Sequence, residues 1–231
     1  MSLEDPPSYS DIDEEICLPS ILILDDLSVY AENAQSAPLY VLNRAVASIT
    51  QATKQVQISR IERKVKTGGN EESTSKTRSR HIYDLKYAEK PPGGLEPMPS
   101  ESPQAYIQAV SRQAVGSIGL KKKRFPSKTV ALPIDLSGKT SKYASLPSFI
   151  KKARPFFQIQ RKNSKFEWSD GDGNAVAVED DIDGQNKLVV TASLRRDFLD
   201  ALVALWCVRI WKDAAEHAER FDGGMEGGDL G

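Results

Sequence analysis

The chain has 231 residues, of which 39% are hydrophobic and 27% are charged, and its formal net charge is −1. This composition is ordinary for a globular protein with polar appendages. The two cysteines, Cys17 and Cys207, are too few for a disulfide framework or a Cys-rich metal site. The acidic first 20 residues lack the basic region of a signal peptide. The longest apolar run, 198–211, is shorter than the roughly 20 residues that span a bilayer. We therefore expect a cytoplasmic protein, with a membrane-peripheral or nuclear location as the alternatives.

The charges are distributed unevenly along the chain. Residues 1–33 carry nine acidic residues and no basic one, whereas residues 34–166 carry 25 Lys or Arg and eight acidic residues. Residues 167–231 are acidic again, with six basic and 15 acidic residues. A basic middle between acidic ends predicts an anionic partner, or shielding of the middle by the ends.

Residues 1–36 form the first predicted region, an acidic tail with scattered Pro and Ser that we expect to be disordered. Within it, Pro6, Pro7 and Tyr9 make the PPxY pattern that WW domains bind. The two prolines preset a polyproline II conformation, so little entropy is lost on docking into an aromatic groove. An inert Pro-rich terminus is the alternative. The aliphatic segment 21–24 fits a first strand docked on the domain or a SUMO-interacting strand, and we favour the docked strand.

Residues 37–221 form the predicted folded domain, in which short apolar segments alternate with turn residues. Period-2 runs of this kind indicate antiparallel strands. The expected strands are Leu39–Leu42, Val46–Ile49, Ile82–Tyr87, Tyr106–Arg112, Thr129–Leu132, Phe157–Ile159, Phe166–Trp168, Val176–Val178 and Leu188–Ala192. Segment 56–65 fits either a strand or a helical face, and 67–79 and 88–104 are expected to be flexible loops. Residues 222–231 hold five glycines and are expected to form a loose tail.

One helix is predicted over about residues 194–220, with Ser193 as its N-cap. From residue 198 to residue 211, 12 of 14 residues are apolar or small. A helix that is hydrophobic all round has to be enclosed by the rest of the protein. The side chains expected to fill the core are Phe198, Leu202, Leu205, Trp206 and Ile210.

Several short strands followed by one almost entirely apolar helix form an unusual combination. The strands above, the hairpin segment 166–178 (FEWSDGDGNAVAV) and the helix segment 198–211 (FLDALVALWCVRIW) carry it. On these residues the chain resembles the tubby-like superfamily, which includes tubby C-terminal domains, phospholipid scramblases and plant LURP-one-related proteins. Segments 80–87 and 109–123 are also similar to fungal proteins of this kind. The resemblance implies a mainly β fold, an antiparallel β-barrel wrapped around a hydrophobic C-terminal helix. A two-layer sheet with one packed helix is the alternative.

Two basic clusters are the candidate sites for an anion or a membrane surface. They consist of Lys121, Lys122, Lys123 and Arg124, followed further along the chain by Lys151 and Lys152. The first cluster also fits a nuclear import signal or a solvated loop. Few aromatic residues are interleaved with these cations, which argues against a nucleic-acid partner. The candidate partners of this surface are an anionic membrane lipid, such as a phosphoinositide, or a protein.

No motif for catalysis, a cofactor or a metal is recognisable. There is no P-loop, Rossmann fingerprint or HExxH sequence, and neither His81 nor His217 accompanies a nucleophile motif. Segment 170–174 resembles the start of a calcium loop, but Ala175 stands where that loop requires glycine. Its Asp-Gly and Gly-Asn pairs instead predict a hairpin turn.

These observations lead us to expect a binding or adaptor protein that is not an enzyme. Its tail would recruit a WW-domain partner such as a Nedd4-type ubiquitin ligase, and its basic surface would contact an anionic membrane or protein. A lipid- or small-ligand-binding module and a nuclear regulator are the alternatives.

Overall fold

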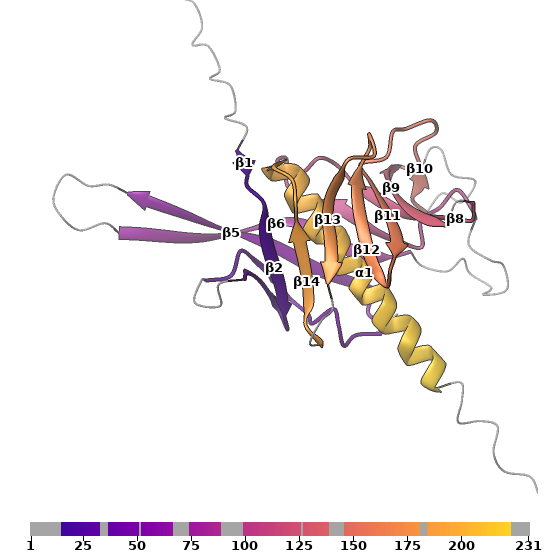
Figure 1. Cartoon of the computed structure of the whole chain (residues 1–231), viewed down its shortest axis with the longest axis horizontal. Coiled ribbons are helices and arrows are strands. Elements are labelled where there is room, and N and C mark those ends of the chain that lie inside the picture. Colours follow the sequence, from indigo (N-terminus) through magenta and orange to yellow (C-terminus); the bar gives the residue numbers. More distant parts are fainter. Residues whose placement is uncertain are drawn as a thin grey trace, which may run out of the picture.

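The computed structural model describes residues 15–32, 37–50, 52–66, 74–88, 99–125, 127–138, 146–180 and 184–222. Its strands form a closed antiparallel barrel of 12 strands, and a single helix, α1 (Arg196–Asp222), runs through the middle of it (Figure 1). The predicted fold class, a β-barrel around a hydrophobic C-terminal helix, is therefore confirmed.

The barrel follows the order β9, β11, β12, β13, β14, β2, β3, β4, β5, β6, β7 and β8, and it closes where β8 pairs with β9. β10 extends the sheet beside β9, while β1 and β15 pair separately with each other. The strands are β1 (Ile16–Cys17), β2 (Ser20–Asp25), β3 (Ser28–Ala31), β4 (Tyr40–Leu42), β5 (Gln55–Lys66), β6 (Thr74–Tyr87), β7 (Ala105–Ala109), β8 (Ile118–Lys123), β9 (Lys128–Asp135), β10 (Ser148–Phe149), β11 (Phe157–Lys162), β12 (Lys165–Asp170), β13 (Ala175–Asp180), β14 (Asn186–Val190) and β15 (Leu194–Arg195).

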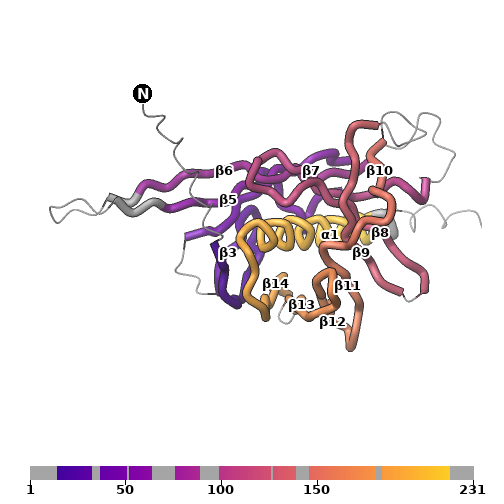
Figure 2. Tube along the Cα trace, turned by 90° about the horizontal axis from the view of Figure 1, so that it is seen from above, coloured from indigo at the N-terminus to yellow at the C-terminus, as the bar shows by residue number. Residues whose placement is uncertain are grey.

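The helix fills the barrel because its apolar residues point in every direction. Figure 2 shows it enclosed between the β5–β8 wall and the β11–β14 wall. Leu202, Leu205, Trp206 and Ile210 are buried, as the all-round apolar sequence requires. Phe198 is only partly buried, and its ring meets those of Phe156 and Phe157 edge-on. The helix therefore supplies the centre of a single hydrophobic core.

The barrel begins earlier in the chain than the predicted boundary at residue 37. β2 lies between β14 and β3, so residues 20–25 form an internal wall strand rather than part of a tail. The favoured docked-strand interpretation of segment 21–24 agrees with this position. Acidic composition misled the prediction, because Asp25 ends β2 and Asp26 lies in the β2–β3 turn while Leu22 and Leu24 face the core.

Three other expectations differ from the structure. Residues 46–48 form a turn, where a strand was expected. β6 begins at Thr74, inside the segment 67–79 that composition had marked as a loop. The helix begins at Arg196, not near Leu194, because Leu194 and Arg195 pair with β1 instead. In each case a long-range backbone pairing or a turn overrides the local pattern.

Two charged residues interrupt the apolar helix, and each has a buried partner on the barrel wall. Asp200, 1% exposed, accepts hydrogen bonds from the Tyr40 hydroxyl (2.8 Å) and from Arg60 Nη1 (2.5 Å). Nine residues further on, Arg209 makes a bidentate ion pair with buried Glu179. A buried charge needs such partners, because its desolvation is otherwise uncompensated.

Candidate functional site: a basic cavity at the barrel mouth

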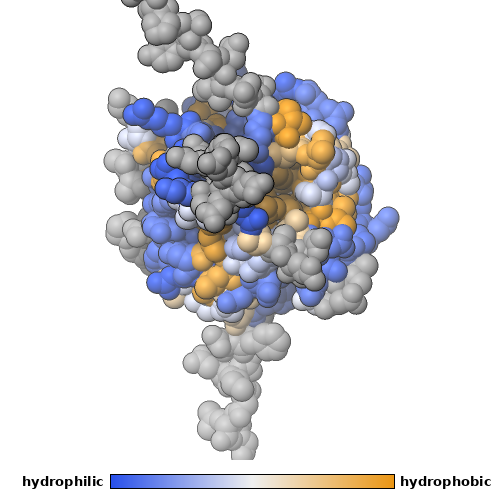
Figure 3. All heavy atoms as spheres, turned by 90° about the vertical axis from the view of Figure 1, so that its left-hand side faces the viewer, coloured by the Kyte–Doolittle hydropathy of each residue, from blue (hydrophilic) through white to orange (hydrophobic). Residues whose placement is uncertain are grey.

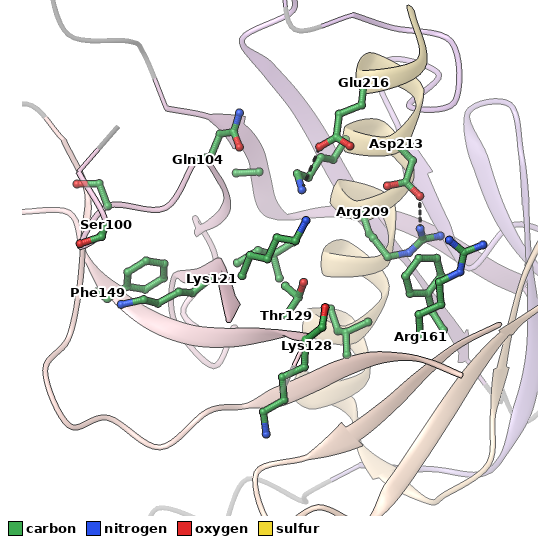
Figure 4. Close-up of a pocket in the computed structure, with 18 of the residues that line it drawn as sticks. Ser100, Gln104, Lys121, Lys128, Thr129, Phe149, Arg161, Arg209, Asp213 and Glu216 are labelled. Atoms are coloured by element: carbon green, nitrogen blue, oxygen red, sulfur yellow. Dashed lines mark hydrogen bonds and ion pairs between the residues drawn. The ribbon is translucent and has the colours of Figure 1, made fainter. Parts of the chain in front are cut away.

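A cavity of about 860 Å³ lies where the C-terminal half of α1 leaves the barrel. Strands β8 and β9 line one side of it, and β11, β12 and the helix line the other (Figure 4). Its charged and aromatic lining residues are Lys121, Lys122, Lys128, Phe149, Arg161, Phe166, Arg209, Lys212, Asp213, Glu216 and His217. The cavity therefore opens on a mainly cationic rim.

The opening results from two places where neighbouring strands part. β7 and β8 pair only through Tyr106 with Gly119 and Ile107 with Ile118, and beyond Gly119 β8 stays paired with β9 alone. On the far side, β11 pairs with β9 up to Ile159 opposite Thr129 and then continues only with β12. Lys121, Lys122 and Arg161 follow these points of separation, so the register places them at the mouth.

Four of the lining cations have no carboxylate partner among the described residues. Lys121 Nζ lies 5.1 Å from the centre of the Phe149 ring, and Lys128 donates a 2.6 Å hydrogen bond to the Gln158 amide oxygen. Lys122 is exposed, and Arg161 lies over an aromatic ring. A cluster of positive charge with no internal counter-ion raises the local concentration of anions.

The helix cations differ, because they are already neutralised. Arg209 pairs with Glu179 and donates a 2.6 Å bond to Asp213, and Lys212 pairs with Glu216 at 3.1 Å. The helix side of the cavity is thus close to neutral, and the free positive charge comes from the strands. Figure 4 shows Lys121 and Phe149 on one side of the cavity and Arg161, Arg209 and Asp213 on the other.

Phe166 lines this cavity and also a smaller one of about 280 Å³. Arg161 and Arg209 both lie against the ring, with their guanidinium carbons 5.8 Å and 4.3 Å from its centre. Phe166, Arg161 and Arg209 line both cavities, so the two form adjoining parts of one mouth. The arrangement offers an apolar ring between cations, which suits an anionic group with an attached apolar part.

Arg209 is held in place by residues inside the wall. Glu179 also accepts a 2.7 Å hydrogen bond from Trp168 Nε1. Burial raises the pKa of Glu179 to about 7, against the opposing effect of the Arg209 charge. Burial likewise raises the pKa of Asp200 to about 6, despite the nearby Arg60.

The structure separates the two predicted basic clusters. Lys121, Lys122 and Lys123 lie on β8, and Arg124 follows in the turn, so this cluster borders the mouth. Lys151 and Lys152 are exposed after β10, where Ile150 donates its backbone N–H to Pro133. Lys121 and Lys123 are opposite Val130 and Lys128, which lie three and five residues from Pro133 on β9, so the clusters are roughly 10–17 Å apart along the strand. Lys151 and Lys152 do not line the cavity.

Sequence reasoning did not find Arg161, Phe166 or Phe149 as site residues. They come from three strands and meet only through the barrel register, so spacing along the chain carries no signal for them. The predicted PPxY residues Pro6, Pro7 and Tyr9 lie outside the described residues.

Neither cysteine is an activated thiolate. Burial raises the pKa of Cys207 to about 12, and it also raises the pKa of Cys17. Nowhere in the described residues do three His, Cys, Asp or Glu side chains gather into a group that could hold a metal ion. Within the same described ranges, no helix combines the length and apolar character needed to cross a membrane.

Comparison with known proteins identifies no relative of this chain. No protein-family model, curated protein or solved structure matches the chain.

Proposed function

We propose that the chain is a non-enzymatic binding and adaptor protein whose barrel mouth contacts an anionic membrane surface. The observation that carries this proposal is the cavity rim, where Lys121, Lys122, Lys128 and Arg161 have no carboxylate partner among the described residues. A membrane with anionic lipids supplies the missing negative charge, at about 1 kcal/mol for each cation near its surface.

The turn that follows β8 supports a membrane rather than a soluble anion. Phe125 is 94% exposed there, directly after the exposed cations Lys122, Lys123 and Arg124. Aromatic rings favour the interface of a bilayer, while adjacent cations meet the anionic headgroups. The turn and the mouth are continuous, because Lys122 and Lys128 flank the turn and also line the cavity.

The architecture also supports the proposed place in the tubby-like superfamily. A closed barrel around an apolar helix is the fold that the resemblance implied, and the hairpin β12–β13 carries part of the matching sequence.

The adaptor half of the proposal rests on sequence alone. Pro6, Pro7 and Tyr9 would dock into the groove of a WW domain, as in Nedd4-type ubiquitin ligases. A motif of this size should bind with a dissociation constant of roughly 1–100 μM, because few contacts offset the cost of association. Titration of a peptide of residues 1–15 into WW domains tests this, and binding that survives Tyr9→Ala unchanged would remove the adaptor role.

Vesicle co-sedimentation tests the membrane role. We expect the full chain to bind vesicles that contain phosphatidylserine and to ignore vesicles of phosphatidylcholine alone. A mouth variant with Lys121→Gln, Lys122→Gln and Arg161→Gln should bind on the order of 100-fold more weakly, because three cations are lost. A control variant with Arg63→Gln, Lys76→Gln and Arg78→Gln removes equal charge far from the mouth and should lose much less.

Two results would contradict the membrane role. One is an equal loss of vesicle affinity in the mouth and control variants, which would show that the binding depends only on net charge. The other is wild-type protein that ignores both vesicles but is stabilised against heat by inorganic phosphate in a mouth-dependent way. The second result would favour a small-ligand-binding module.

A further inference from the structure

The hairpin of β5 and β6 projects beyond the barrel as a two-stranded ribbon. The two strands pair from Gln55 opposite Lys86 to Lys66 opposite Thr74, with one shift of register between Ile58 and Ser59. Figures 1 and 2 show the outer part of this hairpin extending away from the rest of the molecule, on the side opposite β8 and β11. The ribbon is therefore remote from the basic mouth.

The neighbouring strands accompany only the inner part of the hairpin. β4 pairs with β5 as far as Arg60, and Ile61 donates one further backbone bond to Leu39. β7 pairs with β6 no further out than Tyr83. We call residues 62–66 and 74–80 the outer ribbon; both of its edges lack a strand neighbour among the described residues.

The outer ribbon is strongly basic. It holds six Lys or Arg and four Ser or Thr, against one acidic residue, Glu62. The intervening segment 67–73 adds two Glu, so residues 62–80 together keep a net charge of +3. Glu62 is already used, because it pairs at 2.7 Å with Arg60 and at 2.7 Å with Arg80. Figure 3, which views the molecule from the ribbon's side, shows mainly hydrophilic surface with separate hydrophobic patches.

Three cations of the outer ribbon are exposed and have no carboxylate partner among the described residues: Arg63, Lys76 and Arg78. Arg63 is opposite Thr77, whereas Lys76 and Arg78 are opposite Lys64 and Glu62. Since side chains alternate along a strand, Arg63 lies on one face of the ribbon and the other two lie on the opposite face. Positive charge is thus presented on both faces.

Internal packing does not explain such an element. An isolated two-stranded ribbon is marginal in water, and its exposed cations Arg63, Lys76 and Arg78 have no carboxylate partner among the described residues. A polyanion would supply the missing negative charge. A protein partner fits less well, because protein interfaces concentrate their binding energy in aromatic and apolar centres. The described part of the outer ribbon carries no aromatic residue.

We propose that the outer ribbon is an arm that binds double-stranded nucleic acid through its phosphates. Lys and Arg side chains, Ser and Thr hydroxyls and backbone N–H groups are the groups that contact nucleic-acid phosphates, and a two-stranded ribbon fits the major groove of DNA. Stacking aromatics are a requirement of single-strand binding, so their absence does not oppose a duplex. The arm and the mouth are separate sites, so a negative result for one does not contradict the proposal for the other.

Fluorescence anisotropy with a labelled DNA duplex, an RNA duplex and a single strand tests the proposal on the full chain. We expect a duplex to bind, with log affinity falling linearly as log salt rises. The ribbon variant (Arg63→Gln, Lys76→Gln, Arg78→Gln) should reduce that slope by about three and the affinity at about 0.1 M salt by roughly two orders of magnitude. The mouth variant, which removes the same amount of charge, should still bind the duplex. Comparison of the DNA and RNA duplexes shows which groove geometry accommodates the ribbon.

A charge-preserving variant distinguishes loss of positive charge from loss of folding as the cause of weaker binding. The variant Arg63→Lys, Arg78→Lys should keep most of the duplex affinity, because phosphate contacts need charge more than fork geometry. Three results would overturn the proposal: no binding of either duplex by the wild type, equal loss in the ribbon and mouth variants, or tighter binding of the single strand than of both duplexes.

Discussion

The buried pair of Arg60 and Asp200 allows a sharp test of how the barrel holds its helix. Asp200 is 1% exposed and Arg60 9% exposed, and the two are joined at 2.5 Å. Asp200→Leu would leave the guanidinium with Glu62 and the Gln113 amide oxygen, and it would leave the Tyr40 hydroxyl without its acceptor. Breaking a buried pair on one side costs about 3–5 kcal/mol. We expect about 3 kcal/mol here, because Glu62 remains.

Removing the whole polar group should cost much less than removing one member. In the triple variant Tyr40→Phe, Arg60→Met, Asp200→Leu no charge or hydroxyl is left unpaired at this point, and Glu62 keeps its bond to Arg80. Replacement of a buried ion pair by apolar side chains is often neutral or stabilising. The triple variant should therefore be more stable than Asp200→Leu alone, by about 2 kcal/mol or more.

Urea denaturation at pH 7.5, where Asp200 is ionised, measures these differences. A loss of about 3 kcal/mol also lowers the melting temperature of a domain this size by roughly 6–12 °C. Lys162→Met serves as the control, since the Lys162–Glu167 pair is exposed and such pairs contribute at most about 1 kcal/mol. If the triple variant loses as much free energy of unfolding as its three single substitutions together, the three residues are not coupled and the reasoning is refuted.

Three further predictions follow from burial, packing and exposure. Burial raises the pKa of Glu179 from its ordinary 4.5 to about 7, so the folded state binds the carboxyl proton more tightly than the unfolded state does. The free energy of unfolding should therefore fall by about 2–3 kcal/mol as the pH rises from about 5 to 8. Glu179→Gln should make the free energy of unfolding depend less on pH over this range. Gly119→Ala should destabilise the domain by about 1–3 kcal/mol, because its Cβ would lie 2.6 Å from Pro103 Cβ and 2.9 Å from Ile134 Cγ2; an unchanged urea midpoint would show that the wall yields there. Phe125→Ser should leave stability within about 0.5 kcal/mol but weaken vesicle binding; unchanged co-sedimentation would remove the ring from the membrane contact.

The antiparallel strands and the enclosed helix were predictable from two local patterns, whereas the barrel was implied by the resemblance, with a two-layer sheet as the alternative. Period-2 segments required antiparallel strands, and a helix with apolar residues on all sides required an enclosure. Leu202, Leu205 and Trp206 could be placed in the core on that basis, and they lie there. Even the interruptions at Asp200 and Arg209 were visible in the sequence, and buried charges imply partners.

The identity of those partners could not be predicted. Arg60 and Asp200 lie 140 residues apart in the chain, and Glu179, which accepts a hydrogen bond from Trp168, lies 30 residues from its partner Arg209. The mouth depends in the same way on where β8 leaves β7 and β11 leaves β9, which is a property of register. The ribbon was hidden for another reason, since the Ser, Thr and Lys of residues 74–79 have the composition of a loop.

The two ionic contacts of the helix have a role that its apolar contacts cannot fill. Hydrophobic burial is non-directional, so an all-apolar helix inside a barrel could pack in positions shifted by a turn. Asp200 and Arg209 are nine residues apart, about 13 Å along the helix, and each meets a different part of the wall through Arg60 or Glu179. A shift of one turn, about 5 Å, would separate both ion pairs and leave the buried carboxylates of Asp200 and Glu179 without their arginine partners. The contacts thereby fix the helix along its axis, and with it the position of Arg209 against Phe166 at the mouth.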